Sequence, residues 1–104
     1  MNMDIEWLGD SLDLVCGYSK PVRQSIGSEL RLLQNGARPI HARPLKTVAR
    51  GVWEIKVSEM EGQFRVVYLV RRRDRIYVLH AFQKKTRNTP KQDIDLAKKR
   101  LQEI

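Results

Sequence analysis

Cations and hydroxyl groups are concentrated in residues 82–90, between an apolar run and the start of a helical pattern. This segment, Phe-Gln-Lys-Lys-Thr-Arg-Asn-Thr-Pro, contains Lys84, Lys85, Thr86 and Arg87. Ammonium, guanidinium and hydroxyl groups are the donors that bind phosphate oxygens. The composition therefore predicts a phosphate-binding edge to which Lys84, Lys85 and Arg87 contribute charge. Thr86 either donates to the same anion or completes a turn.

The two apolar runs that precede this segment also carry charge. Lys56 lies within residues 51–57 and Arg65 within residues 64–70, at positions where packing alone would favour hydrocarbon. We therefore expect both side chains to place positive charge on a face of a sheet. The planar guanidinium of Arg65 can donate two parallel hydrogen bonds to one phosphate. An ion pair with Glu54 across the hairpin is the alternative role for Arg65.

A third basic group lies at the turn formed by residues 71–75. It contains four arginines and a single acid, Asp74; the arginines are Arg71, Arg72, Arg73 and Arg75. So small a domain does not offer a carboxylate to each of them, so we expect contacts with phosphates of rRNA or DNA. A charged hairpin tip that only keeps the sheet soluble is the alternative.

The overall charge agrees with a polyanionic partner. The chain has a formal net charge of +8, yet residues 1–42 contain only four Lys or Arg against five Asp or Glu. The positive charge therefore belongs to the second part of the chain. A basic half joined to a near-neutral half is typical of proteins that bind nucleic acid with one side, although a solvated basic surface gives the same count.

Length and cysteine content limit the remaining possibilities. The 104 residues are enough for one domain, residues 1–104, with one modest core. Cys16 is the only cysteine, so an intrachain disulfide and a thiolate zinc site are excluded. It lies in an apolar series, where we expect a buried, inert thiol. The chain has no apolar run of membrane length and no basic leader at its start, so we expect a soluble, unprocessed protein. The single cysteine fits the reducing cytoplasm. We expect neither a metal nor a cofactor.

The elements that must position these groups begin with helices. Residues 5–8 suggest a short strand, and Leu12 and Val15 recur at helical spacing after it. A longer helix is predicted from Lys20 to Asn35, with Ser19 as its capping residue and Gly36 in a left-handed C-terminal cap. Its apolar residues are spaced four and three apart, and they are Val22, Ile26, Leu30 and Leu33.

A sheet should follow these helices. Residues 52–57, 64–70 and 76–82 are rich in β-branched and aromatic residues and have short polar separators, which favours a three-stranded antiparallel meander. Prolines exclude helix from the connection before the first of these strands. A final amphipathic helix is predicted to begin at Pro90, with a capping box between Thr89 and Gln92.

This order of elements, with four sequence strings, resembles the RelE/ParE toxin superfamily and in particular its HigB-like, phage-derived host-inhibition branch. The strings are Gly-Val-Trp-Glu-Ile-Lys-Val from Gly51, Phe-Arg-Val-Val-Tyr from Phe64, His-Ala-Phe-Gln-Lys-Lys-Thr from His80 and Thr-Pro-Lys-Gln-Asp-Ile-Asp-Leu-Ala from Thr89. The resemblance covers Ile5 to Leu101. It implies an α+β fold in which two N-terminal helices pack on a three- to four-stranded antiparallel sheet, with a C-terminal helix beside an opposite, concave face.

The resemblance also implies a function. Members of this superfamily include toxins of type II toxin–antitoxin systems that cleave mRNA on the ribosome without a metal. For this chain the resemblance implies a helix-turn-helix antitoxin that neutralises it in a hetero-oligomeric complex. In that chemistry the 2′-hydroxyl attacks the adjacent phosphate and the 5′-oxygen leaves. The protein orients the attack and offsets the charge of the transition state. We therefore expect a ribosome-dependent, metal-independent endoribonuclease that inhibits translation.

Four residues take catalytic roles by this resemblance, and Glu54 is a fifth candidate at a position that departs from the family pattern. Arg65 matches a strand arginine that contacts the scissile phosphate, and Lys56 matches a strand lysine. Lys84 and Lys85 match basic residues at the end of the last strand, one of which binds the phosphate or donates to the leaving oxygen. Glu54 occupies a position where the best-known endonucleases have a lysine.

The departures from the family pattern leave the general base unassigned. No tyrosine or histidine follows the final strand near the C-terminus. Glu54 or His80 are candidates, although a histidine in an apolar strand is more often a core residue, and His41 has less in its favour. Two other functions therefore remain open: a ParE-like topoisomerase (gyrase) poison, and a non-enzymatic nucleic-acid-binding protein on the same scaffold.

Overall fold

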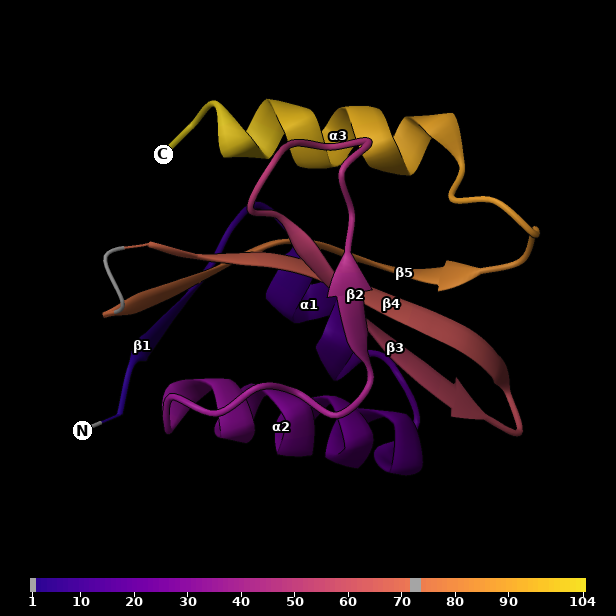
Figure 1. Cartoon of the computed structure of the whole chain (residues 1–104). Coiled ribbons are helices and arrows are strands. Elements are labelled where there is room, and N and C mark those ends of the chain that lie inside the picture. The colour runs from indigo at the N-terminus through magenta and orange to yellow at the C-terminus, as the bar shows by residue number, and fades with distance from the viewer. Residues whose placement is uncertain (1, 72–73) are drawn as a thin grey trace.

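In the part of the chain that the structure describes, the fold has three helices and five strands in an α+β arrangement. The computed structural model describes residues 2–71 and 74–104. The elements, in chain order, are β1 (Asp4–Trp7), α1 (Ser11–Cys16), α2 (Lys20–Gln34), β2 (Ala42–Pro44), β3 (Trp53–Glu59), β4 (Gly62–Arg71), β5 (Arg75–Lys84) and α3 (Lys91–Leu101). Figure 1 shows α2 and α3 on opposite sides of the strands. The predicted α+β class is confirmed.

The five strands form one sheet in the order β1-β5-β4-β3-β2. The antiparallel meander β3–β4–β5 is present as predicted, but the expected total of three to four strands is wrong. The short β2 pairs antiparallel with β3, and β1 pairs parallel with β5. The connection between residues 39 and 44 is therefore partly a strand, because the extended geometry before proline suits an edge position in a sheet.

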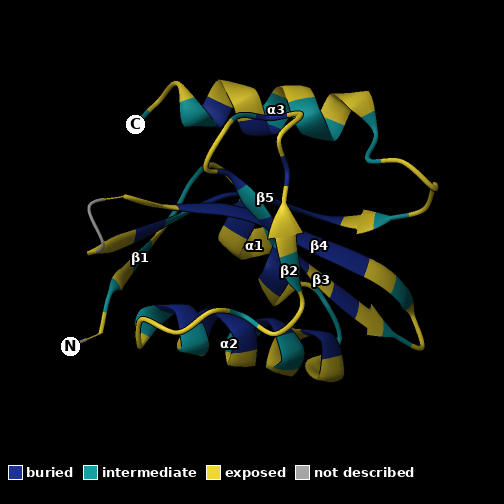
Figure 2. Ribbon diagram, in the orientation of Figure 1, coloured by how far each residue is buried: buried dark blue, intermediate teal, exposed yellow. Residues whose placement is uncertain are grey.

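Alternation along the strands divides the core into two layers. In β3, Ile55 and Val57 pack with the apolar stripe of α2, and Val15 of α1 belongs to the same layer. Side chains from the other face of the sheet, including Val67 and Leu79, pack with Ala97 of α3. Figure 2 shows the buried residues along the middle strands and on the inward side of each long helix. The two N-terminal helices thus share one face of the sheet, and α3 covers part of the other.

The predicted long helix is confirmed, with one difference at its start. The stripe of Val22, Ile26, Leu30 and Leu33 is buried, and Gly36 has a φ of 81°, in the left-handed region. Ser19 does occupy the N-cap position, but its side chain makes no capping bond. Its Oγ instead donates to Oε1 of Glu61 at 2.9 Å, in the β3–β4 turn. The serine therefore joins helix to sheet.

The predicted capping box of α3 is wrong. Pro90, with a ψ of 145°, is the N-cap residue itself, and no side chain caps the helix. Thr89 therefore lies one position too early to accept from the first turn. The helix is held on the sheet by side chains further along it, since Arg100 donates to the carbonyl of Leu79 at 2.9 Å and to Asp10 at 2.6 Å.

The expectation of a buried cysteine is also wrong, because Cys16 is exposed. It is the last residue of α1, and Val15 before it is buried against the sheet. Successive side chains in a helix point about 100° apart, so the neighbour of an inward residue turns toward solvent. Among the described residues, no helix is long and apolar enough to cross a membrane.

Candidate nucleic-acid interface

Charged side chains from four strands gather on the face of the sheet opposite α2. Lys56 of β3 is paired with Arg65 of β4, and Arg43 of β2 is paired with Glu54 of β3. Arg65 is paired in turn with Phe82, two residues before Lys84 on β5. Since residues two apart on a strand share a face, these charged side chains are lateral or diagonal neighbours. The sheet register thereby assembles a single cationic cluster around one acid.

Glu54 is the acid at the centre of this cluster and is completely buried. Its Oε1 accepts a hydrogen bond from Nε of Arg43 at 2.8 Å. Nε of Arg65 lies 3.9 Å from the same oxygen, too far for a hydrogen bond but close enough for a strong charge interaction. The ion pair that was the alternative role for Arg65 is therefore present, and it places the arginine on this face.

The side chain of Arg65 is buried, and its guanidinium group makes fewer hydrogen bonds than it could. It is 5% exposed, and its Nη1 donates to the carbonyl of Phe64 at 3.0 Å. Its Nε and the Oε2 of Glu54 are buried and have no hydrogen-bond partner among the described residues. Burial lowers the pKa of Arg65, and the negative charge of Glu54 opposes that effect. A guanidinium stays protonated in proteins, so this is a fixed positive charge with unused hydrogen-bonding capacity.

The two lysines of the cluster differ in environment. Lys56 is exposed, whereas Lys84 is partly buried. Burial lowers the pKa of Lys84, and the nearby positive charge of Arg65 lowers it further. The ammonium group of Lys84 is consequently a stronger acid than that of an ordinary lysine. Such a group can hold an anion and can also give up its proton to one.

The other residues of the basic segment after β5 lie outside the sheet. Lys85, Thr86 and Arg87 are exposed in the loop that leads to α3. The Oγ1 of Thr86 donates to the carbonyl of Asn88 at 2.6 Å, which corresponds to the turn-completing alternative. Of the three predicted cations in this segment, Lys84 is the one that lies in a strand of the sheet.

The arginines of the β4–β5 hairpin lie at the opposite end of these strands. Arg71 and Arg75 are exposed and paired with each other in the sheet. Six residues of strand separate Arg71 from Arg65, which corresponds to roughly 20 Å. Arg72 and Arg73 lie outside the described residues. One phosphate therefore cannot contact both Arg65 and this hairpin end.

Arg43 is the member of the cluster that sequence reasoning missed. It precedes Pro44, and an Arg-Pro pair with extended geometry is a signal for an edge strand as well as against a helix. Its side chain is 52% exposed and bonded to the buried Glu54. The pairing of β2 with β3, which the local sequence does not specify, brings it to the site.

Neither histidine belongs to the cluster. His80 is buried, with Nε2 2.7 Å from Oδ1 of Asp93 and Nδ1 3.3 Å from Nη1 of Arg100. Both ring nitrogens are thus engaged in fixing α3, as expected of a core histidine. His41 is exposed, and its Nδ1 lies 3.0 Å from Oε1 of Glu29. That carboxylate also accepts from the backbone N–H groups of Ile40 and His41, so it fastens the loop after α2.

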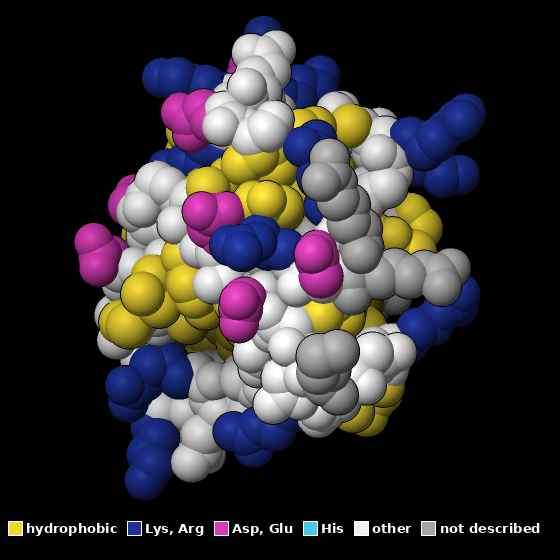
Figure 3. Space-filling model, turned by 90° about the vertical axis from the view of Figure 1, so that its left-hand side faces the viewer, with side chains coloured by type: hydrophobic (Ala, Val, Ile, Leu, Met, Phe, Trp, Pro, Cys, Tyr) yellow, Lys and Arg dark blue, Asp and Glu magenta, His cyan; other side chains and the backbone are white. Residues whose placement is uncertain are grey.

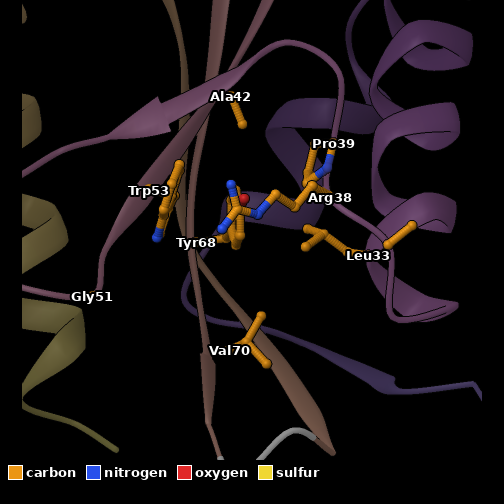
Figure 4. Close-up of a pocket in the computed structure, with 9 residues that line it drawn as sticks. Leu33, Arg38, Pro39, Ala42, Gly51, Trp53, Tyr68 and Val70 are labelled. Atoms are coloured by element: carbon orange, nitrogen blue, oxygen red, sulfur yellow. The ribbon is translucent and has the colours of Figure 1, made fainter.

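Other surfaces of the molecule differ from the cluster. On the side shown in Figure 3, acidic side chains lie in the upper and middle parts of the view, and Lys and Arg side chains lie among them and around the rim. A cavity of about 390 Å³, shown in Figure 4, opens between α2 and the sheet and is lined largely by apolar groups, including Leu33, Trp53 and Tyr68. Burial raises the pKa of Tyr68 to about 12.

Within residues 2–71 and 74–104, no group of three or more His, Cys, Asp or Glu is arranged to hold a metal ion.

The fold and this cluster define a small α+β domain with a preformed cationic sheet face suited to binding an anion. The chain belongs to the family of phage-derived Gp49-like proteins (DUF891), whose model matches residues 16–102. This family is associated with toxins of toxin–antitoxin systems. The match includes α2, strands β2 to β5 and α3, and therefore every residue of the cluster. A comparison with curated proteins gave no match.

Proposed function

We propose that this protein is the toxin of a type II toxin–antitoxin system and that it cleaves mRNA on the ribosome. The observation that carries the proposal is the convergence of Lys56, Arg65 and Lys84 on one sheet face. RNA scission without a metal requires cations that stabilise the charge of a five-coordinate phosphorus. Membership in the Gp49-like family supports the toxin assignment.

The cluster suggests a division of roles in this reaction. The exposed Lys56 contacts the scissile phosphate, and the fixed positive charge of Arg65, opposite it in the sheet, stabilises the charge that is added in the transition state. The 2′-oxygen then bonds to phosphorus while the bond to the 5′-oxygen breaks, giving a 2′,3′-cyclic phosphate and a 5′-hydroxyl. Lys84 gives its proton to the departing 5′-oxygen, a role that its lowered pKa favours.

The environment of Glu54 favours a positioning role over that of a general base. Its carboxylate is completely buried, with one oxygen bonded to Arg43. A base must come within hydrogen-bond reach of the 2′-hydroxyl, which an enclosed carboxylate does not do without rearrangement. In the proposed mechanism, Glu54 holds the guanidinium groups of Arg43 and Arg65, and the proton of the 2′-hydroxyl passes to water.

Substitution of Arg65 tests the proposal directly. Arg65→Gln should reduce cleavage of ribosome-bound mRNA by about 10²–10³-fold, as expected for loss of one donor to the transition state. Lys99→Gln removes the same charge from an exposed position of α3 and should leave cleavage nearly unchanged. The readout is mapping of new 5′ ends after induction, together with cleavage of translated mRNA by purified protein. Intact transcripts with a folded, wild-type protein would contradict the proposal.

The same induced cultures separate the alternative functions. A topoisomerase poison would leave transcripts intact and change plasmid supercoiling, which a topology gel detects. A non-enzymatic nucleic-acid-binding protein would alter neither, and Arg65→Gln would then weaken binding only.

We also propose that a helix-turn-helix antitoxin neutralises the protein by placing an acidic segment over the cationic cluster. Complementary charge gives such a complex a strong dependence on ionic strength. The affinity of the two purified proteins should fall as salt is raised, and less steeply for Arg65→Gln. A complex indifferent to salt would indicate an apolar docking surface elsewhere.

A further inference from the structure

A second basic surface lies on α2, far from the cluster described above. A shallow hollow of about 670 Å³ runs along the outer face of this helix. Its lining contains no acid and no apolar side chain, and consists of Lys20, Arg23, Gln24, Gly27, Ser28 and Arg31. All three cations are exposed, and within the described part of the chain none of them forms a salt bridge.

Gly27, in the middle of the hollow, is not explained by the fold. A Cβ atom built on it would meet nothing within 4 Å, and its φ is not in the left-handed region. Glycine in a helix interior is less stable than alanine, because the flexible backbone loses more entropy on folding. Neither packing nor backbone conformation thus requires glycine here. The glycine leaves the helix backbone open to the close approach of another molecule.

The cations are placed around this opening. Arg23 and Arg31 lie four residues before and after Gly27, so they lie on the same side of the helix, one turn away in each direction. From Lys20 to Arg31 the helix rises by about 16 Å, enough to follow several consecutive phosphates. The inward stripe of α2, which includes Ile26, packs on the sheet face opposite Arg65. A single phosphate therefore cannot contact both basic surfaces.

We propose that this hollow is a second RNA-binding site, which takes a phosphodiester backbone against Gly27 between Arg23 and Arg31. The inference deepens the proposed function and rests on it for the identity of the polyanion. Interfaces with nucleic acid are polar and strongly positive, whereas protein interfaces have an apolar centre, which this hollow lacks. The domain would then hold RNA on both sides of its sheet, with the substrate at Arg65 and a second segment along α2.

Binding measurements in an Arg65→Gln background test the site without cleavage of the probe. The probe is a short, fluorescently labelled oligouridylate, titrated by anisotropy over a range of KCl concentrations. Gly27→Ala should raise the Tm, because alanine is the better helix former and its methyl group meets no atom. The same substitution should weaken RNA binding by about tenfold, equivalent to ~1.4 kcal/mol. Opposite effects on stability and binding would not arise from damage to the fold.

A charge series provides the matched comparison. Arg23→Gln combined with Arg31→Gln should reduce the slope of log Kobs against log salt by about 1.4, since each single-strand phosphate contact contributes about 0.7. Lys98→Gln with Lys99→Gln removes the same charge from exposed positions of α3 and should leave the slope unchanged.

Three results would overturn the inference. The first is unchanged affinity in Gly27→Ala, and the second is an equal loss of slope in the α2 and α3 pairs. The third is binding of polyglutamate to the hollow as tightly as RNA, with the same sensitivity to Gly27→Ala. Because the probe is never cleaved, failure of the ribonuclease assignment would appear in the transcript mapping and not in these titrations.

Discussion

Nε of Arg65 lies 3.9 Å from Oε1 of Glu54, and the two residues are 5% and 0% exposed. Charges removed from water to this degree are stable only when they compensate one another. Arg43 provides the hydrogen bond to the carboxylate, which leaves Nε of Arg65 without a partner. The cationic face is therefore built around one enclosed acid, and its arginine is positioned before any ligand arrives.

Removal of the central acid should destabilise the fold. Glu54→Gln keeps the side-chain volume but leaves Arg65 buried without a countercharge, so we expect the free energy of unfolding to fall by about 3 kcal/mol. Urea denaturation measures this change, with Glu103→Gln as a control at an exposed position whose side chain makes no hydrogen bond or salt bridge to the described residues. A loss equal to that of the control would mean that water already reaches and compensates Arg65.

Cleavage should depend on the proton of Lys84. Burial and the charge of Arg65 lower the pKa of Lys84. Lys84 should therefore lose its proton, and the cleavage rate should fall, at a lower pH than if the residue had the pKa of an ordinary lysine. Lys84→Arg retains the charge with a much higher pKa, and should move that alkaline limb upward while lowering the maximum rate. Single-turnover pH–rate profiles test this. An alkaline limb that does not move in Lys84→Arg would remove Lys84 from the proton transfer.

Tyr68 should make the fold sensitive to alkali. Burial raises its pKa to about 12 in the folded state from 10.0, so above pH 10 the unfolded chain loses this proton while the folded chain keeps it. Stability contributed by the protonated phenol is therefore present below pH 10 and is lost as pH rises toward 12, by up to about 2.5 kcal/mol. Tyr68→Phe should remove this part of the decline. Unfolding curves of both proteins, measured side by side from about pH 9.5 to about pH 12, test this prediction.

The attachment of α3 should depend on the contact between Gly9 and Arg100. Gly9 has a φ of 54°, and a Cβ built on it would lie 2.5 Å from the guanidinium carbon of Arg100. Gly9→Ala should cost about 1–2 kcal/mol for its left-handed backbone, with a further loss because Arg100 is displaced. Gly36→Ala, at a φ of 81° with open space around it, should show the backbone cost alone.

A double-mutant cycle isolates the contact itself. When Arg100→Met is already present, Gly9→Ala should cost less than it does in the parent protein, because the guanidinium is no longer there to be displaced. Thermal or urea unfolding of the four proteins gives the coupling. Strict additivity would show that the arginine adapts freely to the added methyl group.

Local patterns in the sequence determined which residues face inward and which elements form. The spacing of Val22 and Ile26 fixed the inner face of α2, and the alternation of Trp53 to Val57 separated the charged face of β3 from the apolar one. These features follow from the periods of the helix and the strand, which are properties of short segments. The basic character of residues 82–87 was evident for the same reason.

The tertiary structure alone decided which of these charges meet. The register of β3, β4 and β5 places Lys84 beside Arg65 and separates both from Arg71, and the pairing of β2 adds Arg43. No short segment encodes those distances, because strand pairing depends on how the whole sheet buries its two faces against α2 and α3. The same applies to Cys16, whose exposure depends on the rotation of α1 on the sheet. The sequence therefore determined the chemical types available, and packing between distant segments determined the site.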